Sequence, residues 1–269
     1  MITLNLGNMH AYLLEEGKFS LDPGAAFGTV PKPIWSRFVQ PNMNYRIPMA
    51  ANVLLVDNGN RSILVDSGLG SGYEEKFSSI FEINHNAGFF DELEGIVKAE
   101  KIGHIIHSHL HFDHCGNSLY GNTRFPEAKL VFQKKELANL KHPNDLSRYN
   151  YRRPDRSIRN IVSVDGSSII LGFVRLIRTG GHTSGHQAVI IEGSSAELIY
   201  FGDIMPSSVH AKPTHITAID QFPLDTLKFK KLLIKRAIRN RSICIFNHDT
   251  VVSAGYLEGT VDSPRVVPV

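Results

Sequence analysis

The chain has 269 residues, 42% of them hydrophobic and 20% charged, so it is long enough to bury a substantial core. Its formal net charge of +3 is too small to demand an anionic partner, and its two cysteines exclude a disulfide-rich scaffold. No apolar run approaches the roughly 20 residues of a membrane-spanning helix, and the N-terminal stretch lacks the pattern of a signal peptide, so we expect a soluble, cytoplasmic protein with no membrane partner.

Short runs of aliphatic and β-branched residues recur along the chain. A Pro- and Gly-rich stretch, residues 21–48, comes first and is predicted to be irregular. Two apolar runs, residues 52–56 and 62–65, flank the turn residues 57–60 and predict a hairpin. Further strands are predicted at residues 102–106, 130–132, 169–177, 188–191, 198–201 and 243–246.

Helical patterns fall between some of these strands. Residues 134–140 predict a short helix, and residues 224–239, where aliphatic residues alternate with lysines and arginines, predict a long one. Residues 143–159 hold five arginines and are predicted to be a long loop, a type of segment that often serves as a lid or a binding element. Strands that alternate with helices predict a layered α/β fold, and we treat residues 1–269 as a single domain.

The strongest chemical signal is the segment His-Ser-His-Leu-His-Phe-Asp-His, which follows a short apolar strand. Residues two apart in an extended chain point the same way, so His109, His111 and Asp113 are expected to converge. A turn at Asp113, permitted by Gly116, would bring His114 to the same place. Side chains of these types suit zinc, iron, manganese or cobalt, whereas packing alone gives no reason to gather them on one loop.

This segment resembles the metal-binding motif of the metallo-β-lactamase-fold hydrolases, and further elements of that family follow in order. Residues 181–186 are similar to the family's Gly-His-Thr-x-Gly-His element. Residues 202–203 resemble its strand that ends in Gly-Asp, His248 its closing histidine, and residues 66–68 its early Asp-x-Gly turn. The resemblance extends over residues 50–249 and implies a four-layer αββα sandwich with the site at one edge, between two sheets.

The resemblance implies a hydrolase with two divalent metal ions, for which zinc is the first expectation and iron, manganese or cobalt are alternatives. His109, His111 and His182 would hold one metal, and Asp113, His114 and His248 the other, with Asp203 shared. The two cations would share a hydroxide that attacks an acyl or phosphoryl centre. Asp113 and Asp203 are the expected catalytic carboxylates, with Asp113 receiving the proton.

Other polar residues near these motifs are expected to support the site. Asp66 is the candidate partner of a ligand imidazole, with a plain turn residue as the alternative, and His186 is expected to support the site without binding metal. His104 and His107 are predicted to be packed or hydrogen-bonded, and Cys115 to be a buried structural thiol. The histidines that carry no motif are His10, His85, His142, His210 and His215.

Several positions indicate a branch of the family. Asp203 stands where the zinc β-lactamases usually have Cys, and His111 where the di-iron flavoproteins have Glu. The chain after His248 is too short for the glutathione-binding domain of the glyoxalase II type. Residues 21–32 and 202–210 are similar to segments of the branch that contains N-acyl homoserine lactonases, pyridoxolactonase-like enzymes and organophosphate hydrolases.

That branch implies a homodimer that opens a lactone or cleaves another small carboxylic ester, with phosphotriesterase activity as an additional option. Pro206 departs from the lactonase pattern, because those enzymes commonly place a substrate-contacting Tyr there; this puts the homoserine lactone substrate in doubt but not the metal chemistry. Candidates for the substrate pocket, with ordinary packing as the alternative, are Phe27, Trp35, Met43 and Phe112.

Basic residues support an alternative reading. One set lies on or near the helix predicted at residues 224–239, and the other is the five arginines of the loop at residues 143–159. The same fold hosts phosphodiesterases and nucleases, in which positive surfaces bind phosphates. A lysine-rich helix face is usually only solvated, so we rank nucleic acid below a small-molecule ester. A metal-stabilised binding protein without activity is disfavoured by the intact ligand positions.

Overall fold

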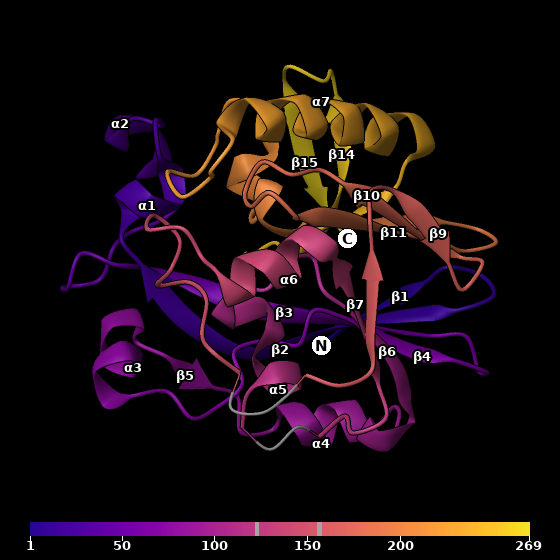
Figure 1. Cartoon of the computed structure of the whole chain (residues 1–269). Coiled ribbons are helices and arrows are strands. Elements are labelled where there is room, and N and C mark those ends of the chain that lie inside the picture. Colours follow the sequence, from indigo (N-terminus) through magenta and orange to yellow (C-terminus); the bar gives the residue numbers. More distant parts are fainter. Residues whose placement is uncertain (122–123, 155–157) are drawn as a thin grey trace.

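Two β-sheets form the centre of the computed structural model, which describes residues 1–121, 124–154 and 158–269 (Figure 1). The strands of the first sheet are β1 (Ile2–Asn5), β2 (His10–Leu21), β3 (Ile47–Asp57), β4 (Ser62–Val65), β5 (Asn84–His85), β6 (Ile102–Ile106), β7 (Lys129–Gln133) and β8 (Ile161–Val164). Their order is β1-β2-β3-β4-β6-β7-β8, and β5 pairs with β2. Neighbours in the series β4, β6, β7 and β8 pair in parallel, and neighbours in the series β1, β2, β3 and β4 pair antiparallel.

The second sheet comes from the C-terminal half of the chain. Its strands are β9 (Ser168–Ile170), β10 (Val174–Arg178), β11 (Gln187–Glu192), β12 (Glu197–Tyr200), β13 (Ile243–Ile245), β14 (Ala254–Gly259) and β15 (Pro264–Pro268). The order is β15-β14-β13-β12-β11-β10-β9, and only the pair of β12 and β13 is parallel.

Helices surround the two sheets (Figure 1). They are α1 (Pro23–Phe27), α2 (Lys32–Trp35), α3 (Glu75–Phe81), α4 (Phe89–Glu94), α5 (Phe112–Leu119), α6 (Lys134–Lys141) and α7 (Pro223–Asn240), with 3-10 turns η1 (Ala99–Lys101), η2 (Gly202–Ile204) and η3 (Ser208–Ala211). In the part of the chain that is described, no helix is long and apolar enough to cross a membrane.

Strand β3 shows how its sequence builds this layering. Leu54 and Val56 belong to the core cluster between the two sheets, whereas Val53 and Leu55 belong to the cluster that includes Phe89 of α4. Successive side chains of a strand point to opposite faces, so a strand that is buried on both sides is apolar at every position. The same alternation in β11 gives a third cluster against α7. The expected four-layer αββα sandwich is therefore confirmed.

Two of the predicted elements differ in the structure. The single strand predicted at residues 169–177 is wrong, because β9 and β10 form an antiparallel hairpin whose connection includes Leu171 (φ 57°) and Gly172 (φ 83°). The stretch 21–48 is not wholly irregular: it contains α1, whose first turn is capped by Asp22, and α2. Residues 143–154 and 158–159 form no helix or strand, as predicted, while Arg156 lies outside the described residues.

Candidate metal centre

The candidate metal-binding side chains lie beyond the carboxyl ends of four strands, where both sheets meet at one edge. His109 and His111 follow β6, and His182 lies in the turn between β10 and β11. Asp203 lies in η2 after β12, and His248 follows β13. Because β12 and β13 are parallel neighbours, their carboxyl ends place Asp203 and His248 side by side.

The chain turns earlier than predicted at the histidine-rich segment. His111 is the N-cap of α5, so Asp113 and His114 lie in the first helical turn and not in an extended chain. Gly116 lies inside this helix, where a Cβ atom would be 1.7 Å from the Leu69 carbonyl oxygen. The glycine therefore permits close contact between α5 and the turn after β4, and the prediction that it permits a turn at Asp113 is wrong.

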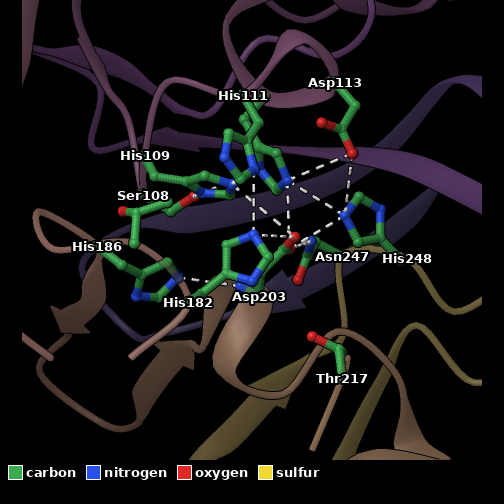
Figure 2. A network of polar contacts seen from close by, with 12 residues as sticks. Ser108, His109, His111, Asp113, His182, His186, Asp203, Thr217, Asn247 and His248 are labelled. Carbon is green, nitrogen blue, oxygen red and sulfur yellow. Dashed lines mark hydrogen bonds and ion pairs between the residues drawn. The ribbon is translucent and has the colours of Figure 1, made fainter. Parts of the chain in front are cut away.

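The seven side chains converge as two buried groups (Figure 2). In the first, His111 Nδ1 lies 2.9 Å from His109 Nε2 and 3.1 Å from His182 Nε2. In the second, His248 Nε2 lies 3.1 Å from His114 Nε2 and 3.4 Å from Asp113 Oδ2. The structure thus brings together every side chain that the sequence motifs singled out as a ligand.

Asp203 faces both groups with different oxygen atoms (Figure 2). Its Oδ2 lies 3.3 Å from His182 Nε2 in the first group, and its Oδ1 lies 3.0 Å from His248 Nε2 and 3.2 Å from His114 Nε2 in the second. A carboxylate in this position is suited to bridge two cations.

Hydrogen bonds outside the cluster decide which imidazole nitrogen is free. His248 Nδ1 donates to the Ala50 carbonyl (2.7 Å), because a carbonyl oxygen can only accept. His114 Nδ1 lies 2.7 Å from Asp66 Oδ2, and His182 Nδ1 lies 2.8 Å from Asp220 Oδ1. The Nε2 lone pairs of these three histidines therefore point into the cluster.

This donor set fits divalent metals. The Nε2 atoms of His114 and His248 face each other at 3.1 Å while both Nδ1 atoms are engaged as donors elsewhere, so a cation is needed between them. Burial lowers the pKa of His114, but Asp203, Asp113 and Asp66 outweigh it and raise this pKa well above its usual value. A proton can serve only one such pair of atoms, whereas a divalent ion can accept several imidazoles and carboxylates at once.

Asp66 contacts the imidazole of a candidate ligand, His114, in the position that the sequence suggested. Besides His114, it accepts hydrogen bonds from Ser108 N–H (2.7 Å), Ser108 Oγ (2.8 Å) and the Tyr200 hydroxyl (2.8 Å). Ser108 Oγ in turn lies 3.1 Å from His109 Nδ1. Burial alone would raise the pKa of Asp66, but the larger combined effect of His114 and His107 lowers this pKa below its usual value. The carboxylate is therefore held ionised. One buried carboxylate thus orients an imidazole of each group.

His186 contacts the site without joining either group. Its Nε2 accepts a hydrogen bond from the Asp203 N–H (3.0 Å), and its Nδ1 lies 2.6 Å from Thr179 Oγ1. Burial and then His182 lower its pKa to about 3, so it stays neutral with the proton on Nδ1. It fixes the backbone at Asp203, which is the supporting position that the sequence analysis expected.

Two buried carboxylates were missed from the sequence. Asp220 holds His182 Nδ1, and its two oxygens also accept hydrogen bonds from Thr217 (2.7 Å) and Thr226 (2.6 Å). Glu136, in α6, accepts from Leu110 N–H (3.0 Å) and from the Thr183 hydroxyl, which joins the two ligand-bearing loops. Neither lies in a recognisable motif, and only their burial and contacts identify them.

The family model described as "Metallo-beta-lactamase superfamily" matches residues 46–233. The chain belongs to this superfamily. It is therefore a metal-dependent hydrolase with the expected fold.

Three individual relatives each share less than a quarter of their aligned residues with this chain. An N-acyl homoserine lactonase from Bacillus cereus is 24% identical over 261 residues, which covers 88% of this chain and 92% of that protein. A probable metal-dependent hydrolase from Staphylococcus aureus has a similar structure, with a TM-score of 0.88, 23% identity and coverage of 98% and 99%. The dizinc quorum-quenching lactonase AidC, in complex with a product, has a TM-score of 0.78, 19% identity and coverage of 100% and 97%.

A small, mostly apolar pocket of about 30 Å³ adjoins both groups of candidate ligands. Four candidate ligands reach its wall: His111, Asp113, Asp203 and His248. The rest of the lining is Phe19, Leu21, Ala26, Met49, Phe81, Phe112, Asn150, Pro206, Thr217 and Ile219. The candidate metal centre therefore faces this pocket with Asp113 and Asp203.

Other side chains singled out from the sequence take ordinary places. Of the four pocket candidates only Phe112 lines this pocket; Phe27 and Trp35 stack on each other in a buried cluster, and Met43 is fully exposed. Cys115 is a buried free thiol, and His107 lies 3.0 Å from Ser118 Oγ, so both readings are confirmed. The histidines without a motif lie outside both groups, and His210 packs on Phe27.

Proposed function

We propose that this hydrolase opens a lactone or cleaves another small, uncharged carboxylic ester at a centre of two divalent metal ions. Zinc is the first expectation for these ions. The observation that carries the proposal is the pocket: its described lining contains no lysine or arginine. Apart from the metals, an anionic phosphate ester would find no cationic group there, whereas an acyl chain or an alkyl ring would bury apolar surface. Relatives named N-acyl homoserine lactonase support the choice of a lactone.

Each part of the site has a role in this proposal. His109, His111 and His182 would hold one metal and Asp113, His114 and His248 the other, with Asp203 between them. Bound metals would lower the pKa of a water molecule and polarise the scissile carbonyl. Asp113, which reaches the pocket wall, would receive the proton of the attacking water on a carboxylate oxygen and pass it to the leaving alcohol.

An uncharged phosphotriester meets the same physical requirements and is kept as a secondary substrate class. A phosphodiesterase or nuclease is ranked lower: the metals would match the charge of the scissile phosphate, but the described lining has no lysine or arginine for the neighbouring phosphates of a nucleic acid. A single domain over residues 1–269, a cytoplasmic location and a homodimer stay sequence-based predictions.

Metal analysis combined with two ligand variants tests the proposal. The purified protein should hold two equivalents of metal and open lactones, and chelation should abolish this activity. His109→Ala and Asp203→Ala should each lose metal and at least about 100-fold in kcat/KM, because each removes a direct ligand. His10→Ala, at an exposed histidine outside both groups, is the matched control and should change neither quantity. Wild-type turnover by His109→Ala would refute the metal assignment.

A substrate panel separates the two ester classes. We expect lactones and activated carboxylic esters to be cleaved faster than bis(p-nitrophenyl) phosphate or RNA. Phosphodiester cleavage that exceeds every lactone and ester rate would leave the metal centre intact but overturn the choice of substrate.

A further inference from the structure

The pocket beside the metal centre contains one polar side chain whose hydrogen-bonding capacity is unused. Apart from the candidate metal ligands, its described polar lining residues are Thr217 and Asn150. The Thr217 hydroxyl donates to Asp220 Oδ1 (2.7 Å) and is thus committed to holding His182. The Asn150 carboxamide has no hydrogen-bond partner among the described residues and is partly exposed at the pocket wall.

The backbone of Asn150 is nevertheless held in a fixed position. Its N–H donates to the Ser147 carbonyl (2.9 Å), and its carbonyl accepts from the Phe112 N–H (2.9 Å) at the start of α5. The second contact attaches Asn150 to the helical turn that carries Asp113. The unpartnered carboxamide therefore lies on a loop that is tied directly to the metal centre.

The two residues that follow Asn150 strengthen this attachment. The Tyr151 hydroxyl donates to Glu136 Oε2 (3.1 Å), the carboxylate that also holds Leu110 N–H. Arg152 donates through Nη1 to the Ser71 carbonyl (2.7 Å) and lies over the Tyr120 ring at 4.7 Å. The backbone at Asn150 and the side chains of Tyr151 and Arg152 are thus held in place before a ligand arrives.

A carboxamide in this setting selects for a particular kind of ligand. It offers two N–H donors and one carbonyl acceptor, while the apolar side chains around it offer none. A bound apolar ligand would displace water from the amide and leave it unpaired, which costs more than a hydrogen bond gains. The group that matches it best is a second amide, which pairs a donor with an acceptor in both directions.

We propose that Asn150 is a specificity-determining residue that binds an amide group carried by the substrate next to its scissile ester. This inference rests on the proposed function, because it assumes that the ester enters the same pocket. Asn150 orients the substrate through this hydrogen bond, while the metal centre and Asp113 act on the ester itself.

Paired substrates isolate this contact. One is an N-alkanoyl homoserine lactone, and the other is an α-alkyl-γ-butyrolactone of equal chain length, in which the chain joins the same ring carbon without the amide. Asn150→Leu removes the donor and the acceptor at similar size, and Asn150→Asp removes the N–H donors. For the amide-bearing lactone we expect kcat/KM to fall about ten-fold in both variants, mainly through a higher KM. For the alkyl lactone Asn150→Leu should stay within about two-fold of the wild type.

Control variants and measurements exclude a merely structural effect. Tyr149→Ala, at the exposed neighbouring position of the same loop, should leave both substrates unaffected. Metal stoichiometry and Tm of Asn150→Leu should match the wild type, because the contacts with Ser147 and Phe112 are made by the backbone. Equal losses on both substrates, or no loss on the amide-bearing one, would overturn the proposal.

A binding measurement separates this inference from the proposed function. The corresponding cyclopentanones, in which a ring CH2 replaces the ring oxygen, have no ester to hydrolyse, and calorimetry gives their Kd with the metal-loaded protein. We expect Asn150→Leu to weaken the N-alkanoyl compound about ten-fold and to leave the alkyl compound unchanged. If the wild type hydrolyses neither lactone, the proposed function fails, and the cyclopentanone pair still decides the role of Asn150. Wild-type protein that binds neither cyclopentanone would overturn it.

Discussion

Three imidazoles of the candidate metal centre have the nitrogen that points away from the cluster restrained by a specific acceptor. The acceptors for His248 and His114 are the Ala50 carbonyl and Asp66, and for His182 the acceptor is Asp220. Burial alone would raise the pKa of Asp220, but His182 and the two threonines that donate to this carboxylate outweigh burial and lower its pKa below the usual value. An ionised acceptor keeps the proton on His182 Nδ1 and leaves the Nε2 lone pair for a metal.

Removing the Asp220 carboxylate should therefore weaken metal binding without touching a ligand. We expect Asp220→Ala to lower the affinity for zinc about 10- to 100-fold, because His182 loses both its orientation and its preferred tautomer. Competition with a chromogenic chelator measures this affinity. Asp225→Ala, at an exposed carboxylate in the first turn of α7, is the matched control. Unchanged zinc affinity in Asp220→Ala would show that Asp220 only packs.

At the scale of elements, the position of α5 depends on a close contact with the turn after β4. The Ser67 N–H donates to the His114 carbonyl (2.7 Å), and the Gly116 N–H donates to the Gly68 carbonyl (2.8 Å). The same turn contains Asp66, so this contact sets the distance between Asp66 and His114. The helix can approach so closely only because Gly116 has no side chain.

A single methyl group at Gly116 should consequently damage both stability and the metal centre. The Cβ of Gly116→Ala would lie 1.7 Å from the Leu69 carbonyl oxygen and 2.4 Å from the Gly70 nitrogen, which are backbone atoms that cannot rotate away. We expect the free energy of unfolding to fall by about 3 kcal/mol or more in denaturant titrations. Gly103→Ala is the control, because its Cβ would meet nothing closer than 3.9 Å, and it should change stability by less than about 1 kcal/mol. Equal stabilities of the two variants would contradict this account of α5.

The elements that the sequence predicted well are those with a clear period or a short turn signal. The hairpin of β3 and β4 and the helix α7 are of this kind. The hairpin of β9 and β10 was missed because apolar residues flank Gly172 on both sides and hide the turn within one run. The seven candidate ligands were found because they occur in motifs, whereas Asp220 and Asn150 are isolated residues in loops, and only tertiary contacts bring them to the site.

For the whole molecule, the charge distribution opposes a phosphate-binding surface. The basic residues of the C-terminal helix do not form one free face, since Arg236 binds Glu197 at 3.1 Å and Lys231 binds Asp262 at 2.7 Å. Lys230 was counted with this basic face from the sequence, but it is fully buried and donates to the carbonyls of Lys212 and His215. Burial lowers its pKa to about 7. Several basic residues of the helix are therefore engaged in contacts within the protein and are not free to bind phosphates.

This distribution predicts that catalysis is insensitive to salt. A neutral lactone enters a pocket whose described lining has no cationic side chain, so kcat/KM should change less than about two-fold between 50 and 500 mM NaCl. An enzyme that neutralises six to ten phosphates of a nucleic acid would lose about 10³- to 10⁵-fold in affinity over an even narrower range of salt. Initial rates at constant pH and metal loading provide the measurement. Hydrolysis of acetylcholine, a cationic ester, over the same salt range tests for unbalanced charge near the site. A steep decrease in the lactone rate with salt would mean that charged surface residues guide the substrate, and would favour the nucleic acid alternative.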